Sequence, residues 1–231
     1  MSNYFTVSIS VDYLIILHKE NMGIVFIRQA PGVDFDAKFI EELRRAIQFE
    51  EIGLPQTEGD ITQGTVKGKY VILRSGKWTT TILVINSQPN RFTREALHSF
   101  AIRLESRWGR ELRDIYGELA ADIDVFKKDT ETRQSVTKLT DEIFHLEFTL
   151  PHKLGLPSQE LKGLQKKVWG VAEELARGQG YVLLGELMTT ASEKFGRDKS
   201  EIPDVIYDFV LRGFMSPIPL DQFMEKYGGK K

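Results

Sequence analysis

The sequence contains no cysteine among its 231 residues. Without thiols the chain forms no disulfide, offers no thiolate nucleophile and builds no cysteine-based zinc site. A composition free of cysteine fits a reducing compartment. We therefore expect a cytoplasmic protein that reaches membranes, if at all, through a partner.

Long apolar runs are absent as well. The longest run covers residues 13–17, far short of the roughly 20 residues that a transmembrane helix needs. Residues 1–10 have neither a basic start nor a long apolar core, so we expect no secretory signal. The net charge of −2 gives no bulk attraction to nucleic acid or to anionic membranes.

Motifs that carry catalysis are also missing. Gly59 and Gly64 have the spacing of a phosphate-binding loop, but Thr65 and Val66 stand where that loop needs lysine followed by serine or threonine. The sequence has no G-x-S-x-G elbow, and its four histidines lie in unrelated segments. We therefore expect no catalytic residue, no cofactor and no metal ligand, and we predict that the protein is not an enzyme.

A change of hydrophobic period organises the first 145 residues. Patterns typical of strands cover residues 8–18, 24–29, 60–67, 69–74 and 78–86. Helical spacing predicts a first helix capped by Asp34 or Asp36, and further helices over residues 91–117 and 130–145. The polar strand 60–67 belongs at a sheet edge, and we expect Gly64 to mark a bulge in it.

The remaining residues indicate a second, smaller module. Two prolines and a glycine predict a linker at residues 148–157. We expect Ser158 to cap the first helix of this module, a second helix over residues 183–195, and a third that starts at Ser200. A short strand follows the third helix. The expected domains are residues 1–147 and 158–231.

The element order over residues 8–145 resembles a longin domain. The residues that carry the resemblance are VDYLIILHKENMGIVFIRQ, the helix with Ile40, Leu43 and Ile47, the hairpin GKYVILRSGKWTTTILVIN, and the helix ALHSFAIRLESRW. The resemblance implies an α+β fold with three α/β/α layers, in which one helix covers one face of a five-stranded antiparallel sheet and two helices cover the other. Cover on both faces would explain why residues 13–17 and 81–85 do not alternate.

The three helices and the short strand of the second module resemble a winged helix. Longin and related roadblock domains serve as binding platforms in membrane traffic and small-GTPase regulation, and many pair with another such domain. The two resemblances together imply a non-enzymatic adaptor. Its expected partner is a small GTPase or another longin/roadblock-type subunit, bound in a homo- or heterodimer.

Two groups of residues are the candidate partner interface. The polar edge strand could accept a strand from a partner. The arginine-rich helix is either a solvated face with intrahelical pairs such as Arg107 with Glu111, or a surface for an acidic partner. The predicted interface residues are Ile61, Thr62, Gln63, Thr65, Lys67, Arg103, Arg107 and Arg110.

A DNA-binding transcriptional regulator with a longin-like sensor or dimerisation domain is the alternative function, because winged helices often read the major groove. The candidate recognition helix, residues 200–211, carries Glu201, Asp204 and Asp208. Three carboxylates facing phosphates would repel them. We therefore expect a protein partner in preference to nucleic acid.

Overall fold

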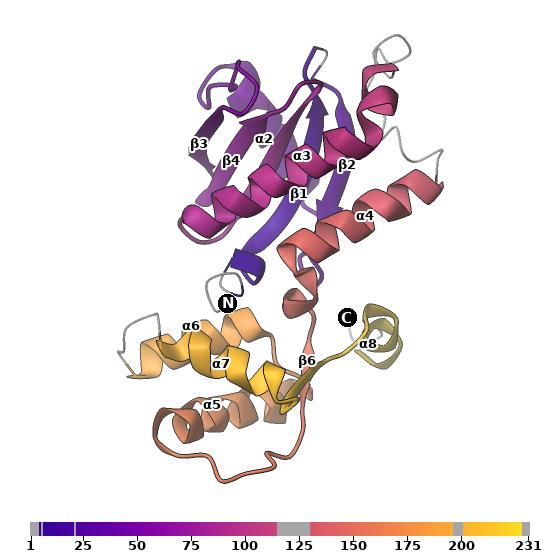
Figure 1. Cartoon of the computed structure of the whole chain (residues 1–231). Helices are drawn as coiled ribbons and strands as arrows, with labels where there is room; N and C mark the ends of the chain where they lie inside the picture. Colours follow the sequence, from indigo (N-terminus) through magenta and orange to yellow (C-terminus); the bar gives the residue numbers. More distant parts are fainter. Residues whose placement is uncertain (1–4, 6, 21, 115–129, 196–200, 228–231) are drawn as a thin grey trace. The chain divides into compact units, whose positions relative to one another are not determined.

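A five-stranded antiparallel sheet organises residues Ser10–His145 (Figure 1). The strands are β1 (Val11–His18), β2 (Ile24–Gln29), β3 (Ile61–Val66), β4 (Lys69–Ser75) and β5 (Thr79–Ile85). They lie in the order β2-β1-β5-β4-β3, so β2 and β3 form the two edges. The expected five-stranded antiparallel sheet is confirmed.

The structure is a computed structural model that describes residues 5, 7–20, 22–114, 130–195 and 201–227. The chain divides into two units. One unit is Ser10–His145, and the other combines Met1–Ile9 with Leu146–Lys231. Within the described residues, no helix has both the length and the apolar character that crossing a membrane requires.

Helices cover both faces of the sheet (Figure 1). Helix α2 (Ala37–Gln48) lies on one face, and helices α3 (Arg91–Asp114) and α4 (Thr130–Phe144) lie on the other. Every residue of β1 and β5 is consequently buried. Cover on both sides is why these central strands lack an alternating pattern in the sequence.

Helix α2 begins at the second of its two candidate caps. The Asp36 carboxylate accepts a hydrogen bond from the amide of Phe39 at 3.0 Å, which satisfies one of the free donors in the first turn. Phe39, Leu43 and Ile47 lie on the buried side of the helix and pack against sheet residues such as Tyr13. The apolar spacing read from the sequence therefore identifies the face that covers the sheet.

Gly64 lies in an unbroken register between β3 and β4, so the expected bulge at this position is wrong. The glycine has a packing reason instead. A β-carbon at Gly64 would lie 2.8 Å from Cγ1 of Ile52, whose buried side chain occupies that space. Lys67 and Gly68 form the β3–β4 loop with φ of 49° and 79°, the values that a tight two-residue hairpin needs.

The second unit is mostly helical. Its elements are a 3₁₀ turn (Leu146–Thr149), β6 (His152–Leu154), α5 (Gly163–Gln179), α6 (Leu184–Phe195), α7 (Glu201–Leu211), β7 (Met215–Pro217) and α8 (Leu220–Tyr227). The three helices α5 to α7 surround a core that contains Trp169, Phe209 and Phe214. Phe5 and Ile9 belong to the same core, so the N-terminal segment completes this unit rather than the sheet.

The segment expected to be a linker, residues 148–157, contains strand β6. This strand pairs antiparallel with β7, and His152 also bridges to Val182. Ser158 is not the helix cap that we expected, because α5 begins at Gly163 with Lys162 as its N-cap. Three residues are too few to show a strand period, and only the distant partner β7 makes them a strand.

Candidate functional site

Strand β3 presents a free backbone edge. Among the described residues it is paired with β4 alone. Val66 and Lys69 close the two-residue hairpin loop and therefore form a hydrogen-bonded pair. Because such pairs alternate along an antiparallel ladder, the amides and carbonyls of Ile61, Gln63 and Thr65 point away from β4. These groups are the ones that a partner strand would engage.

The side chains of β3 divide between the two faces of the sheet. Ile61 lies opposite Arg74 in the register, and both face α3, since Arg74 contacts that helix. Gln63 shares this face because side chains alternate along a strand. Thr62 points to the α2 side, where its hydroxyl donates to the carbonyl of Gly53 at 2.6 Å. The side chains of the predicted edge residues thus point to two different faces of the sheet.

Lys67 also lies toward α2. Its ammonium group pairs with the carboxylate of Glu42 at 2.9 Å, although the lysine side chain stays 66% exposed. An exposed pair of this kind contributes little to stability. Lys67 therefore lies at the edge with its positive charge already paired with Glu42.

One side of α3 lies along β3 and β4. Nη2 of Arg94 donates to Oε1 of Gln63 at 2.9 Å, and Nε of Arg74 donates to Nδ1 of His98 at 3.2 Å. Arg94 and His98 are four residues apart, which places them on the same side of the helix. These contacts were not predicted from the sequence. The helical spacing of Arg94 and His98 was the only signal available for them.

Arg74 is a nearly buried cation with 5% of its surface exposed. Within the described part of the chain it forms no ion pair with a carboxylate. Burial lowers the pKa of Arg74, and the charges of Glu105 and Glu58 offset part of that effect from a distance. The residue opposite Arg74 on β5 is Thr81, whose buried hydroxyl has no hydrogen-bond partner in the structure. The buried polar groups of Arg74 and Thr81 under α3 therefore do not all have hydrogen-bond or ionic partners among the described residues.

The three predicted arginines form a separate group. Arg103, Arg107 and Arg110 are exposed on α3. Arg103 lies about 14 Å along the helix from Arg94 and about half a turn around it, given 1.5 Å and 100° per residue. The arginines and the β3 edge are consequently two surfaces and not one.

The intrahelical pair that we expected between Arg107 and Glu111 does not form among the described residues. The guanidinium of Arg107 instead lies over the ring of Trp108, 4.8 Å from its centroid. The backbone at Trp108 departs from helical geometry, with φ of −121°, so the helix is kinked at this position. The charge of Arg107 remains available to an acidic partner.

The β4–β5 hairpin is held in place by a carboxylate of α3. The Glu105 carboxylate of α3 accepts hydrogen bonds from the amides of Lys77, Trp78 and Thr79 at 2.7, 2.9 and 3.0 Å. A β-carbon on Gly76 would displace this carboxylate from its position at the turn. The apolar residues of both strands fill the interior of the sheet.

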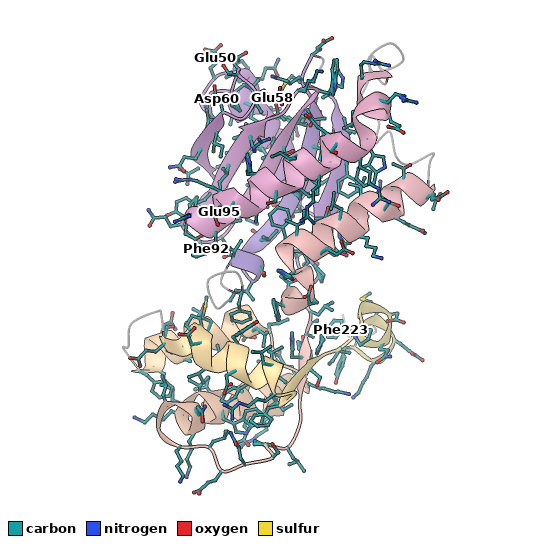
Figure 2. All side chains as sticks on the ribbon, in the orientation of Figure 1. Glu50, Glu58, Asp60, Phe92, Glu95 and Phe223 are labelled. Carbon is teal, nitrogen blue, oxygen red and sulfur yellow. The ribbon has the colours of Figure 1, made fainter. Side chains whose placement is uncertain are left out.

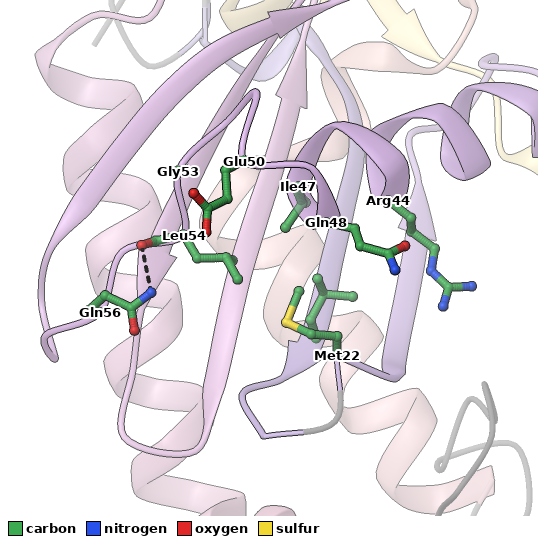
Figure 3. Close-up of a pocket in the computed structure, with 9 residues that line it drawn as sticks. Met22, Arg44, Ile47, Gln48, Glu50, Gly53, Leu54 and Gln56 are labelled. Carbon is green, nitrogen blue, oxygen red and sulfur yellow. Dashed lines mark hydrogen bonds between the residues drawn. The ribbon is translucent and has the colours of Figure 1, made fainter.

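A pocket of about 730 Å³ lies at the end of α2, beside the β1–β2 turn (Figure 3). Leu17, Ile47 and Leu54 supply apolar walls, and Arg44 and Glu50 carry its charges. Its volume is that of a small-molecule site, for which roughly 300–1,000 Å³ is typical. The residues that line it include no histidine, no serine and no pair of carboxylates. The pocket offers space for binding without a constellation for catalysis.

Metal-binding side chains do not gather in the parts of the chain that the structure describes. No cluster of three or more histidine, aspartate or glutamate residues there has the geometry to hold a metal ion. The chain matches no protein-family model, and it has no significant match among curated proteins. The fold itself, a mixed α/β chain with a five-stranded antiparallel sheet, is what defines its class.

Proposed function

We propose that this chain is a non-enzymatic adaptor that binds a protein partner at the free edge of β3. The observation that carries the proposal is the row of outward backbone groups at Ile61, Gln63 and Thr65 beside exposed side chains. An open edge of this kind can take up a strand from another chain. The longin-like element order makes a small GTPase or another longin/roadblock-type subunit the first expected partner, in assemblies of membrane traffic or GTPase regulation.

The other edge of the sheet is less available to a partner. On β2, Arg28 forms a two-pronged contact with Asp141 of α4, with hydrogen bonds of 3.2 and 3.1 Å. This contact ties a side chain of β2 to α4. Strand β3 is the more exposed edge: Ile61, Gln63 and Thr65 are exposed, whereas no residue of β2 is, which favours β3 as the binding edge.

The charges of the second unit disfavour the DNA-binding alternative. Glu201 and Asp204 are exposed on α7, and Asp208 is already paired with Arg212 at 2.8 Å. Strand β7 pairs with β6, which precedes the helices in sequence, so these two strands do not form the hairpin of a wing. A DNA-reading surface would need several unpaired cations at this helix.

A pull-down with the full chain tests the proposal. The baits are small GTPases loaded with GDP or a GTP analogue, and longin- and roadblock-type subunits. We expect at least one of them to bind the wild-type chain. The variant Thr65→Pro should lose this binding, because proline removes an outward amide while the β3–β4 hydrogen bonds remain.

Thr57→Pro is the matched control, since Thr57 lies in the exposed loop before β3. This variant should bind like the wild type. Binding that survives Thr65→Pro would place the interface elsewhere. A chain that binds none of these proteins and retards duplex DNA with a steep salt dependence would be the transcriptional regulator instead.

A further inference from the structure

The α3-facing side of the β3 edge carries both an apolar and a cationic group. Ile61 is 37% exposed. Two residues further along, Gln63 holds the guanidinium of Arg94 at 2.9 Å. We call Ile61, Gln63 and Arg94 the β3–α3 surface. A strand added at this edge would place alternate side chains directly beside Ile61 and Gln63.

Arg94 differs from the other solvent-accessible cations around β3, whereas Arg74, opposite Ile61, is buried. The neighbouring pairs are Lys67 with Glu42, Lys69 with Asp12, and Arg91 with Glu95. Each of these three cations already has a carboxylate. Arg94 is exposed and its recorded contact is with the neutral amide of Gln63. A carboxylate opposite Gln63 would therefore meet a cation that has no carboxylate partner among the described residues.

Two negatively charged residues lie near the start of β3. Glu58 and Asp60 lie beside the start of the strand (Figure 2), and both are exposed. They disfavour a second acidic side chain near Ile61, while the isoleucine itself favours an apolar neighbour.

Resting on the proposed function, we infer that the β3 edge selects an extended partner segment with the pattern acidic-x-apolar, read from its N-terminus. Antiparallel addition places the acidic residue opposite Gln63, where Arg94 binds its carboxylate. The residue two positions later then packs on Ile61. The outward amides and carbonyls of Ile61, Gln63 and Thr65 supply the strand pairing, and the two side chains supply the selectivity.

A titration with defined peptides tests this inference. The probes are the blocked peptide Thr-Val-Thr-Asp-Thr-Val-Thr and its counterparts with asparagine or lysine in place of aspartate. The readout is the amide NMR signals of the ¹⁵N-labelled full chain, which detect weak binding. We expect the aspartate peptide to shift the β3 amides at about tenfold lower concentration than the asparagine peptide, as a charge-assisted hydrogen bond would produce.

Arg94→Glu should reverse the preference, so that the lysine peptide binds best. Arg103→Glu makes the same change in net charge on the other side of α3, and it should keep the preference of the wild type. Equal affinity of the aspartate and asparagine peptides for the wild-type chain would overturn the selectivity and leave strand addition intact. If no peptide shifts the β3 amides at millimolar concentration, the edge-binding function itself is wrong.

Discussion

The Glu105 carboxylate stabilises the β4–β5 turn because it accepts hydrogen bonds from three backbone amides there. It also accepts one from the Thr79 hydroxyl at 2.9 Å. We expect Glu105→Ala to lower the free energy of unfolding of Ser10–His145 by about 2 kcal/mol, the usual scale for hydrogen bonds to a charged group. Glu105→Gln keeps an acceptor oxygen and should lose less. Urea unfolding measures the change in the free energy of unfolding, and hydrogen exchange of the β4 and β5 amides shows whether the loss lies in this hairpin.

The control for this prediction is Glu111→Ala. Glu111 lies on the same helix, is exposed and makes no ion pair among the described residues. Its removal should change the free energy of unfolding by less than about 0.5 kcal/mol. Equal unfolding midpoints for the two alanine variants would show that Glu105 does not hold the turn.

His152 makes the second unit sensitive to acid. Burial lowers its pKa to about 4, and a hydrogen bond between Nδ1 and the Leu150 carbonyl, at 2.8 Å, offsets part of this effect. The folded unit therefore keeps His152 neutral where the unfolded chain, with a pKa near 6.5, takes up a proton. Above pH 6.5 His152 is neutral in both states and does not lower the free energy of unfolding. As the pH falls from 6.5 toward 4, the unfolded chain takes up the proton first, and the free energy of unfolding drops by roughly 3 kcal/mol in all.

His152→Asn tests this pH dependence, since its side-chain amide can replace Nδ1 as the donor but does not titrate. The free energy of unfolding of the second unit, measured at about pH 7 and about pH 4.5, should fall less in the variant than in the wild type. His145→Asn, at an exposed position, should behave like the wild type. An unchanged acid response in His152→Asn would refute the role of His152.

At the scale of elements, strands and helices with a clear hydrophobic period could be predicted from the sequence. Strand β2 and the start of α3 agree to the residue, and α4 agrees to within one residue at its end. The predicted end of the α3 helix, residues 115–117, lies outside the described residues. These elements are long enough for their period to identify the buried face.

Other features depend on residues far apart in the chain, and no local pattern could reveal them. Strand β6 exists through its pairing with β7, and helix α8 after β7 was not anticipated. The edge character of β3 was predicted from its polar residues, but the placement of Arg94 over Gln63 follows from where α3 crosses the sheet. The sequence could thus predict which strand forms the candidate edge. The side-chain contacts of that edge depend on the three-dimensional fold and could not be predicted.

Strand β3 depends on a glycine at its centre. We expect Gly64→Ala to destabilise Ser10–His145 by about 1–3 kcal/mol, because the new β-carbon would press on the buried side chain of Ile52. The double variant Gly64→Ala with Ile52→Val removes a methyl group from the crowded space and should recover part of the loss. Thermal unfolding of both variants measures this coupling, and its absence would mean that Ile52 is not the limiting contact.

At the scale of the whole molecule, the second unit is assembled from both ends of the chain. Phe5 is fully buried, and its ring centroid lies 5.1 Å from that of Phe148 and 5.8 Å from that of Tyr207. The amide of Ile9 donates to the carbonyl of Phe5 at 3.1 Å, and the two residues have the spacing of one helical turn. Phe5 and Ile9 are therefore part of the core of the second unit.

We expect Phe5→Ala to destabilise the second unit by about 3–5 kcal/mol, the usual loss for a buried phenylalanine. Hydrogen exchange should show faster opening of α5 to α7, while the amides of the five-stranded sheet keep their protection. Phe49→Ala is the matched control, since Phe49 is 70% exposed and its removal should have little effect. Equal loss of protection in both units would contradict the assignment of Phe5 to one of them.

This arrangement has a consequence for biosynthesis. Phe5 and Ile9 leave the ribosome before the sheet is made, whereas the helices that bury them emerge only after residue 145. The sheet unit is complete in the meantime and can fold on the growing chain. Phe5 and Ile9 can therefore reach their buried positions only after the helices of the second unit have been synthesised.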